Sequence, residues 1–391
     1  MSSCHEDVRL KAEDRRGIVV SDRTIIKSMY NSSPIHQFPR REFLFGAAAL
    51  TAGVLLPIHE SPAQDSSKSF RRIDIHHHFG PPKWCAFLTA RNVLYPSWTG
   101  WTPALAVEEL DRAGVATAMI SITYPGIWLG ENVVPIEATR SMARECNDYG
   151  AKMVADHPGR FGLFAVLPLP DIDGSLREIE YVFDTLKADG IGVLTSYGDK
   201  WLGDPAFAPV FEELNRRKAV VFTHANVPTC CTRGGSGAQR YLVPGVNNNV
   251  IEYGTDTTRA IMSLVVINAN DRYPNIRFTF SHAGGTMPFL IERILGRKEM
   301  ASLADPTRPN ARLHQLRQFY YDTANANNVV AMTALKEVVG LPQILFGTDF
   351  PYEGSVADQA NDLKTCGAFS AAELEAIYYD NALRLLPHLR I

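Results

Sequence analysis

The sequence predicts an α/β protein whose main domain is a (β/α)8 barrel, the TIM-barrel architecture. Eight short apolar runs alternate with longer amphipathic stretches over residues 70–391, which is the order of a parallel sheet with crossover helices. The runs are almost entirely apolar, as strands are when helices cover both sides of a sheet. A doubly wound open sheet is the alternative. The lack of a Gly-rich phosphate-binding fingerprint after the first run counts against it.

Strands and helices can be placed along the chain from these patterns. We expect strands at 71–76, 115–124, 161–169, 191–197, 219–225, 276–282, 319–323 and 344–349. We expect helices at 102–114, 135–157, 175–188, 205–217, 257–270 and 370–385. The first helix has the clearest ends, because Thr102 can cap it, Pro103 suits the first helical position and Gly114 can close it.

The N-terminal segment differs from the rest of the chain. Arg40 and Arg41 precede a short apolar stretch rich in Ala and Gly, at 46–56, which is typical of a twin-arginine export signal. We therefore expect an extension at 1–63 that is cleaved after Ala63, a linker at 64–69 and the barrel at 70–391. The twin-arginine translocase would be a partner during export to the periplasm.

Two alternatives to this reading stay open. The protein is cytoplasmic if the signal is not used, and translation could start at Met29, which lies closer to the arginine pair than Met1 does. The apolar stretch is shorter than the roughly 20 residues that span a bilayer. We therefore expect no stable membrane anchoring after the signal is removed.

Charge and cysteine content exclude some classes of function. The formal net charge is -3 and no basic block stands out, so we do not expect nucleic acid as a partner. Six cysteines scattered over a long chain do not form a disulfide framework. The expected partner is a small-molecule substrate.

The hexamer Asp74–Phe79, which contains three consecutive histidines, is the most informative stretch of the sequence. Side chains alternate between the two faces of a strand, so His76 and His78 point one way and His77 the other. Two imidazoles on one face can bind the same divalent ion. The alternative is a histidine-rich surface turn.

Other ionisable residues also end predicted strands. The fifth strand ends near His224, the sixth at His282, the seventh near Asp322 and the eighth at Asp349. Functional residues of such barrels lie at the carboxyl ends of the strands, and a buried ionisable group is costly unless it is paired or bound to metal. His76, His78, His224 and Asp349 therefore form a candidate site for one divalent ion. His282 is left as an acid or base.

These motifs together resemble the amidohydrolase superfamily, and more narrowly the branch of aminocarboxymuconate semialdehyde decarboxylase and the aromatic-acid decarboxylases. The resemblance extends from Arg71 to the C-terminus and implies a barrel of the metal-dependent hydrolase type. It implies that His76, His78, His224 and Asp349 bind one metal ion, zinc first and manganese second, and that His282 and Asp349 are catalytic. A bridging lysine after the fourth strand has no counterpart at 195–197, so a single ion is expected. The resemblance also allows a homodimer.

The resemblance implies a carboxy-lyase that removes CO2 non-oxidatively from a small, salicylate-like hydroxylated aromatic acid. A hydrolase of a lactone, ester or amide that uses a metal-activated water is the alternative. A metal carrier without catalysis is a third possibility. Aromatic side chains after the first two strands, Trp98, Trp101, Tyr124 and Trp128, could contact the substrate ring. The candidate substrate-binding residues are Trp101, Tyr197, Arg259 and Asp322.

Overall fold

The computed structural model describes residues 71–389 except 132, 229–242, 306–309 and 353. The expected extension at 1–63 and the linker at 64–69 lie outside the described residues. None of the described helices is both long enough and apolar enough to cross a membrane.

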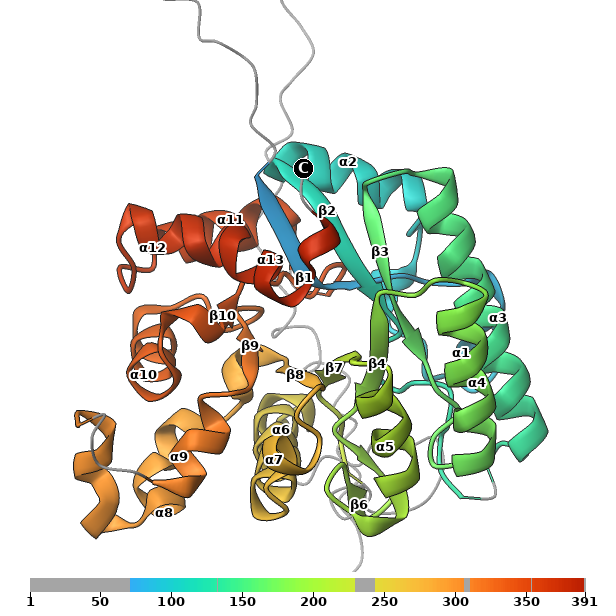
Figure 1. The fold of residues 1–391 in the computed structure, drawn as a ribbon. Helices are drawn as coiled ribbons and strands as arrows, with labels where there is room; N and C mark the ends of the chain where they lie inside the picture. The colour runs from blue at the N-terminus through green and yellow to red at the C-terminus, as the bar shows by residue number, and fades with distance from the viewer. Residues whose placement is uncertain (1–70, 132, 229–242, 306–309, 353, 390–391) are drawn as a thin grey trace, which may run out of the picture. The chain divides into compact units, whose positions relative to one another are not determined.

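Eight parallel strands form the central sheet (Figure 1) in the order β1-β2-β3-β4-β7-β8-β9-β10. They are β1 Arg72–His78, β2 Val115–Ser121, β3 Phe161–Val166, β4 Gly190–Leu194, β7 Val220–His224, β8 Arg277–Phe280, β9 Tyr320–Asp322 and β10 Ile344–Leu345. The backbone around β10 returns to β1, where Ile75 N donates to Phe346 O at 2.9 Å and His78 N donates to Phe350 O at 2.9 Å. The predicted barrel is confirmed, with every predicted strand present.

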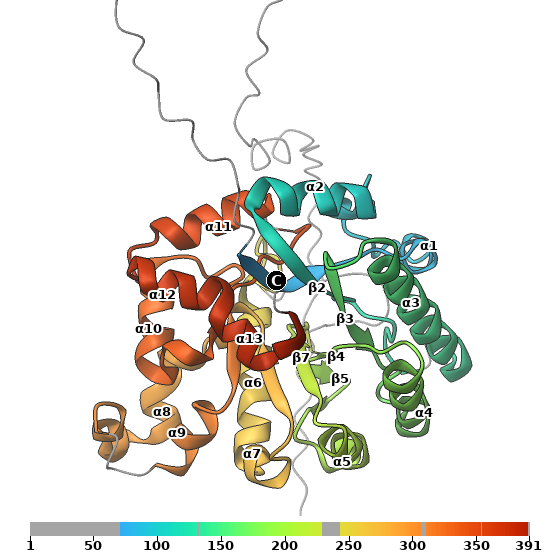
Figure 2. The same ribbon diagram turned by 45° about the horizontal axis from the view of Figure 1, so that its top comes forward.

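Helices surround the strands (Figure 2). They are α1 Pro82–Thr89, α2 Pro103–Ala113, α3 Ile136–Asp156, α4 Ile172–Asp184, α5 Ala208–Arg216, α6 Asn249–Val266, α7 Ala269–Arg272, α8 Ile291–Leu295, α9 Ala311–Leu316, α10 Val329–Val339, α11 Val356–Thr365, α12 Ala371–Glu375 and α13 Asn381–Leu385. A small antiparallel hairpin, β5 Ser196–Tyr197 with β6 Lys200–Trp201, follows β4.

Local sequence explains where several helices begin and end. In α2 the Thr102 side chain accepts from Leu105 N, and Gly114 adopts φ 62° beyond the last turn, so both predicted ends are confirmed. The prediction for α4 started too late, because Asp171 caps the helix by accepting from Gly174 N. The prediction for α6 also started too late. Its early turns contain Gly254, where the backbone of Gly285 approaches so closely that a Cβ on Gly285 would lie 2.1 Å from Gly254 O.

The predicted last helix is divided into three parts. A π-helical turn, Ala376–Asp380, separates α12 from α13. Ala382 and Leu385 of α13 pack with Ile73, Val220 and Leu345, residues at or near the beginnings of their strands. Apolar side chains thus fill the amino-terminal end of the barrel, and the ionisable residues lie at the opposite end.

Candidate metal centre

The four predicted metal ligands meet at the carboxyl ends of β1, β7 and β10. His76 Nε2 lies 3.0 Å from His78 Nε2, and Asp349 Oδ1 lies 3.1 Å from the first and 2.9 Å from the second. His224 Nε2 is 3.7 Å from the same oxygen. All four side chains are buried, and their ligand atoms lie within 4.8 Å of one another.

The second ring nitrogens of two of these histidines are already engaged. His78 Nδ1 lies 3.1 Å from Ser121 O, and His224 Nδ1 lies 2.8 Å from Ala225 O. A backbone carbonyl only accepts, so each Nδ1 carries the hydrogen and each Nε2 turns a lone pair toward Asp349. Neutral imidazole nitrogens converging on one carboxylate oxygen form a donor set that suits a first-row divalent ion. The residues present therefore fit a single metal ion.

The electrostatics of the cluster distinguish His76 from its neighbours. Burial alone would lower the pKa of His76, but the carboxylates of Asp322 and Asp349 raise it to about 10. Burial lowers the pKa of both His78 and His224 to about 4. Burial would raise the pKa of Asp349, but the charge of His76 and the hydrogen bond that His76 donates hold it well below its usual value. Without an ion, His76 is therefore doubly protonated and positively charged at neutral pH.

His282 lies beside the cluster with one free nitrogen. Its Nδ1 is 3.2 Å from Ala324 O, so this nitrogen carries the hydrogen. Its buried Nε2 has no hydrogen-bond partner among the described residues and lies 4.0 Å from Asp349 Oδ2. Burial lowers the pKa of His282 to about 4. His282 is therefore neutral, with an acceptor nitrogen available to a ligand.

Residues 322–325, at the end of β9 and directly after it, contact His76, His282 and Asp349. Asp322 Oδ2 is 2.9 Å from His76 Nδ1, and Asp322 Oδ1 accepts from the backbone N of His282 at 3.0 Å. Asn325 Nδ2 donates to Asp349 Oδ2 at 2.7 Å. Sequence reasoning missed Asn325; its place three residues after the strand-ending Asp322 was the available signal.

Asp74 and His77 support the site from outside the ligand set. Asp74 accepts from the backbone N of His76 at 3.0 Å and from Thr348 Oγ1 at 2.6 Å. His77 Nδ1 lies 3.0 Å from Asp74 Oδ2, and its ring stacks on Phe350 at 5.0 Å. The pairing of β1 with β2 has a register shift between Asp74 and His77, and in this stretch His76 packs against Phe222 with ring centroids 5.0 Å apart. Such bulges often occur beside active sites.

A cavity of about 600 Å³ opens onto His224, His282 and Asp349. Aromatic side chains line it, and the Tyr253 ring stacks on His282 with ring centroids 6.3 Å apart. Tyr352 packs edge-on to His78 at 6.0 Å. The other lining residues are Tyr95, Thr123, Asn249, Val250, Gly254, Ala283, Gly285, Thr286, Asn325, Ala326, Asn328 and Ala331. Sequence reasoning did not find Tyr95, Tyr253 or Tyr352.

The four predicted substrate-binding residues are not among those that line this cavity. Trp101 packs on Trp98 at 5.8 Å. The Tyr197 hydroxyl accepts from Leu194 N at 3.0 Å, and the Arg259 guanidinium lies 3.4 Å from Glu252. Asp322 is fully buried beneath His76. Protein neighbours therefore engage the side chains of all four residues.

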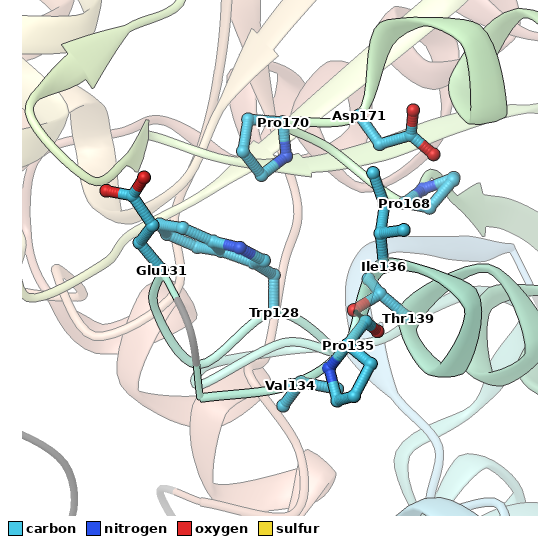
Figure 3. Close-up of a pocket in the computed structure, with 9 residues that line it drawn as sticks. All are labelled: Trp128, Glu131, Val134, Pro135, Ile136, Thr139, Pro168, Pro170 and Asp171. Atoms are coloured by element: carbon cyan, nitrogen blue, oxygen red, sulfur yellow. Dashed lines mark hydrogen bonds between the residues drawn. The ribbon is translucent and has the colours of Figure 1, made fainter.

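A second cavity of about 500 Å³ lies between the loops that follow β2 and β3. Figure 3 shows Trp128 on one side of it, facing Pro170 and Ile136. Trp128 therefore lines a different hollow from the one beside the metal ligands. Trp98 donates from Nε1 to the Tyr352 hydroxyl at 2.8 Å, and Tyr124 packs on Tyr253 at 5.7 Å. These two aromatic residues contact side chains that line the cavity but do not line it themselves.

The chain is similar to known decarboxylases. The amidohydrolase family model matches residues 73–388. Decarboxylase macB of Penicillium terrestre is 37% identical over 293 residues, covering 72% of this chain and 84% of that protein. The 6-methylsalicylic acid decarboxylase of Penicillium expansum is 33% identical over 285 residues, covering 72% and 85%.

A solved structure has the same fold. It is a dihydroxybenzoic acid decarboxylase from a Polaromonas species, with bound manganese and the inhibitor 2-nitroresorcinol. It aligns with a TM-score of 0.65 at 21% identity, covering 82% of this chain and 98% of that one.

Proposed function

Because this chain belongs to the amidohydrolase family, we propose that it is a metal-dependent carboxy-lyase acting on a small hydroxylated aromatic acid. It would remove CO2 without oxidation from a salicylate-like substrate. The supporting observation is the buried His282 Nε2, which has no described partner and lies beside the four-ligand cluster in a cavity lined by tyrosines. Relatives named as decarboxylases, among them one for 6-methylsalicylic acid, support the same reaction class.

In this proposal His76, His78, His224 and Asp349 hold one divalent ion. The bound ion would supply electrostatic stabilisation for the anionic oxygens of the acid. Zinc is the first expectation for this donor set. Manganese, which the Polaromonas decarboxylase binds, is the second.

The protein's own groups would orient the ring and move the proton. Tyr253 and Tyr352 offer aromatic surfaces to a flat ring. His282 is neutral, so its Nε2 can accept the proton of the substrate hydroxyl and then deliver it to the ring carbon that bears the carboxylate. The bond from that carbon to the carboxylate then breaks, its electron pair returns to the ring, and CO2 leaves. A proton from solvent restores the phenol.

Asp349 is the other candidate proton donor, and its electrostatics make it a poor one. Its pKa is held well below the usual value, so it is ionised at neutral pH. Asn325 donates to the oxygen that faces His282. We therefore assign Asp349 to metal binding and His282 to proton transfer.

The decisive experiment combines metal analysis of the purified protein with a panel of hydroxybenzoates, measuring both CO2 and the phenol. We expect about one divalent ion per chain and release of CO2 and phenol in equal amounts. His282→Asn should keep the metal and lose roughly 100-fold or more in kcat. Asp349→Asn should lose both metal and turnover.

Other results would overturn the proposal. Incorporation of oxygen from labelled water into a product carboxylate, with no CO2, would establish the hydrolase. Bound metal without turnover on acids, lactones, esters and amides, and no change in any property of His282→Asn, would indicate a carrier.

A further inference from the structure

The two oxygens of Asp349 have different surroundings. Oδ1 faces His76, His78 and His224, and Oδ2 accepts a hydrogen bond from Asn325 Nδ2 at 2.7 Å. Asp349 has a φ of 57°, in the left-handed region that few residues other than Gly, Asn and Asp adopt. The regular pairing of a strand therefore does not orient this side chain, and its hydrogen bonds must.

Asn325 contributes the hydrogen bond to Oδ2 from the adjacent strand end. It also has a positive φ, 55°, which Asn tolerates better than most residues. The amide can face the carboxylate only with its NH2 group, since two acceptor oxygens at 2.7 Å would repel one another. His282 Nε2, at 4.0 Å from Oδ2, is too far away to replace this bond.

The torsion about the bond from Cβ to Cγ of Asp349 decides whether a carboxylate oxygen meets the histidines. The two oxygens are equivalent, so a half-turn restores the same arrangement, whereas intermediate angles would leave both oxygens away from the cluster. The Asn325 bond fixes this torsion, because a charge-assisted hydrogen bond is short and directional. Asn325 lines the cavity beside His282 and Asp349, so it acts at the site without being a member of the ligand set.

We propose that Asn325 is the positioning residue of the metal centre, holding Asp349 so that Oδ1 stays with the three histidines. This inference rests on the proposed metal centre. Neighbours that orient metal ligands commonly change metal affinity or activity by about 10- to 100-fold when they are replaced. The same loss is expected here, although Asn325 binds no metal itself.

Two substitutions separate the hydrogen bond from the backbone conformation. Asn325→Gly accepts the positive φ and removes the donor. Asn325→Asp has almost the same shape, also tolerates this φ, and places a second carboxylate against Asp349. The controls are Asn92→Gly and Asn92→Asp. Asn92 has the same φ of 55° but is exposed in the loop after α1, so its variants should match the wild type.

Metal affinity is measured by chelator competition with Zn²⁺, and ligand geometry by the visible spectrum of the Co²⁺-substituted protein. We expect Asn325→Gly to weaken zinc binding about tenfold, Asn325→Asp to weaken it further, and both to alter the cobalt spectrum. With saturating metal, kcat should fall about tenfold while KM changes less than about threefold, because Asn325 acts through Asp349. Thermal unfolding of the metal-free proteins checks that the variants fold.

The proposal would be overturned if folded Asn325→Gly bound zinc within about twofold of the wild-type affinity and had an unchanged cobalt spectrum. The metal measurements do not depend on turnover. If the wild-type protein binds metal but decarboxylates nothing, the proposed reaction fails, whereas the role of Asn325 is still decided by the affinities.

Discussion

His76 differs from the other histidines of the cluster because two carboxylates, Asp322 and Asp349, face it. Its pKa of about 10 means that it is protonated at neutral pH when no ion is bound. The pKa of His78 and of His224 is about 4, so both are already neutral. A metal ion needs neutral imidazole and must displace the additional proton that makes His76 cationic.

Metal affinity should therefore rise with pH. Between about pH 6 and 9 the apparent Kd should fall about tenfold per pH unit, since one proton leaves for each ion bound. Chelator competition at several pH values measures the slope, and calorimetry in buffers of different ionisation enthalpy counts the proton. An apparent Kd that does not vary with pH would contradict the protonation of His76.

The cluster of candidate metal ligands could be predicted from the sequence and much of the cavity could not. His76, His78, His224 and Asp349 each end an apolar run, so strand order alone brings them to one end of a barrel. Tyr253 lies on a helix and Tyr352 on a loop, and their positions over the site depend on how those elements pack. Trp101 and Tyr197 have the right chemistry, but protein neighbours occupy their side chains.

The close packing of the residues after β10 requires a glycine at position 347. A Cβ on Gly347 would lie 2.8 Å from His76 Cβ and 2.9 Å from Asp322 Cβ. Neither contact can be relieved by moving the flexible end of a side chain. Gly347 therefore permits His76 and Asp322 to approach one another.

Gly347→Ala should lower the free energy of unfolding by about 1–3 kcal/mol through overpacking and should weaken metal binding. Urea unfolding of the metal-free protein measures the first effect, and chelator competition the second. Gly192→Ala in β4 is the matched control, because its nearest neighbour would lie 3.4 Å from the new Cβ. An equal loss of unfolding free energy in the two variants would show that the crowding at Gly347 does not affect stability.

Helices α3 and α4 are joined through Asp171. Its carboxylate caps α4 by accepting from Gly174 N at 3.1 Å and accepts from Arg140 Nε of α3 at 2.5 Å. The hydrogen bond from Arg140 lowers the pKa of Asp171 below its usual value of 3.8. The stabilisation is therefore complete above pH 3.8 and is lost as the pH falls through the lower pKa of the folded state.

Asp171→Ala should cost about 1–2 kcal/mol of the free energy of unfolding at neutral pH. The difference from the wild type should shrink on acidification, in urea titrations at decreasing pH. Asp173→Ala is the control, since it removes an exposed carboxylate from the first turn of the same helix. A constant difference at all pH values would mean that the charge of Asp171 does not stabilise the contact.

The fold class could be predicted from the sequence, because eight apolar runs, each followed by an amphipathic stretch, are the pattern of a (β/α)8 barrel. The division of the last helix into α12, a π-helical turn and α13 was not predictable. Ala382 and Leu385 of α13 pack with core residues that lie far away in the sequence, and a local sequence pattern does not reveal such contacts.

A chain that starts at residue 70 should fold and bind metal as tightly as the full chain. β1 begins at Arg72, and all four ligands belong to strand ends of the barrel. Circular dichroism and zinc competition compare the two proteins. A large loss of affinity in the shorter chain would show that the N-terminal extension contributes to the site.

Export through the twin-arginine route stays a prediction from Arg40 and Arg41. Replacing both by Lys should keep the precursor in the cytoplasm of a bacterial host, because that translocase reads the arginine pair. Cell fractionation and N-terminal sequencing measure the outcome, with cleavage after Ala63 expected for the wild type. Unchanged export of the double variant would contradict the signal.

The packing of α13 against the strand beginnings determines where the substrate can enter and where the products can leave. Because apolar side chains fill that end of the barrel, the acid, the phenol and CO2 must all use the opposite opening. The phenol left by one turnover and the acid for the next therefore share one opening. Added phenol should then compete directly with the incoming acid.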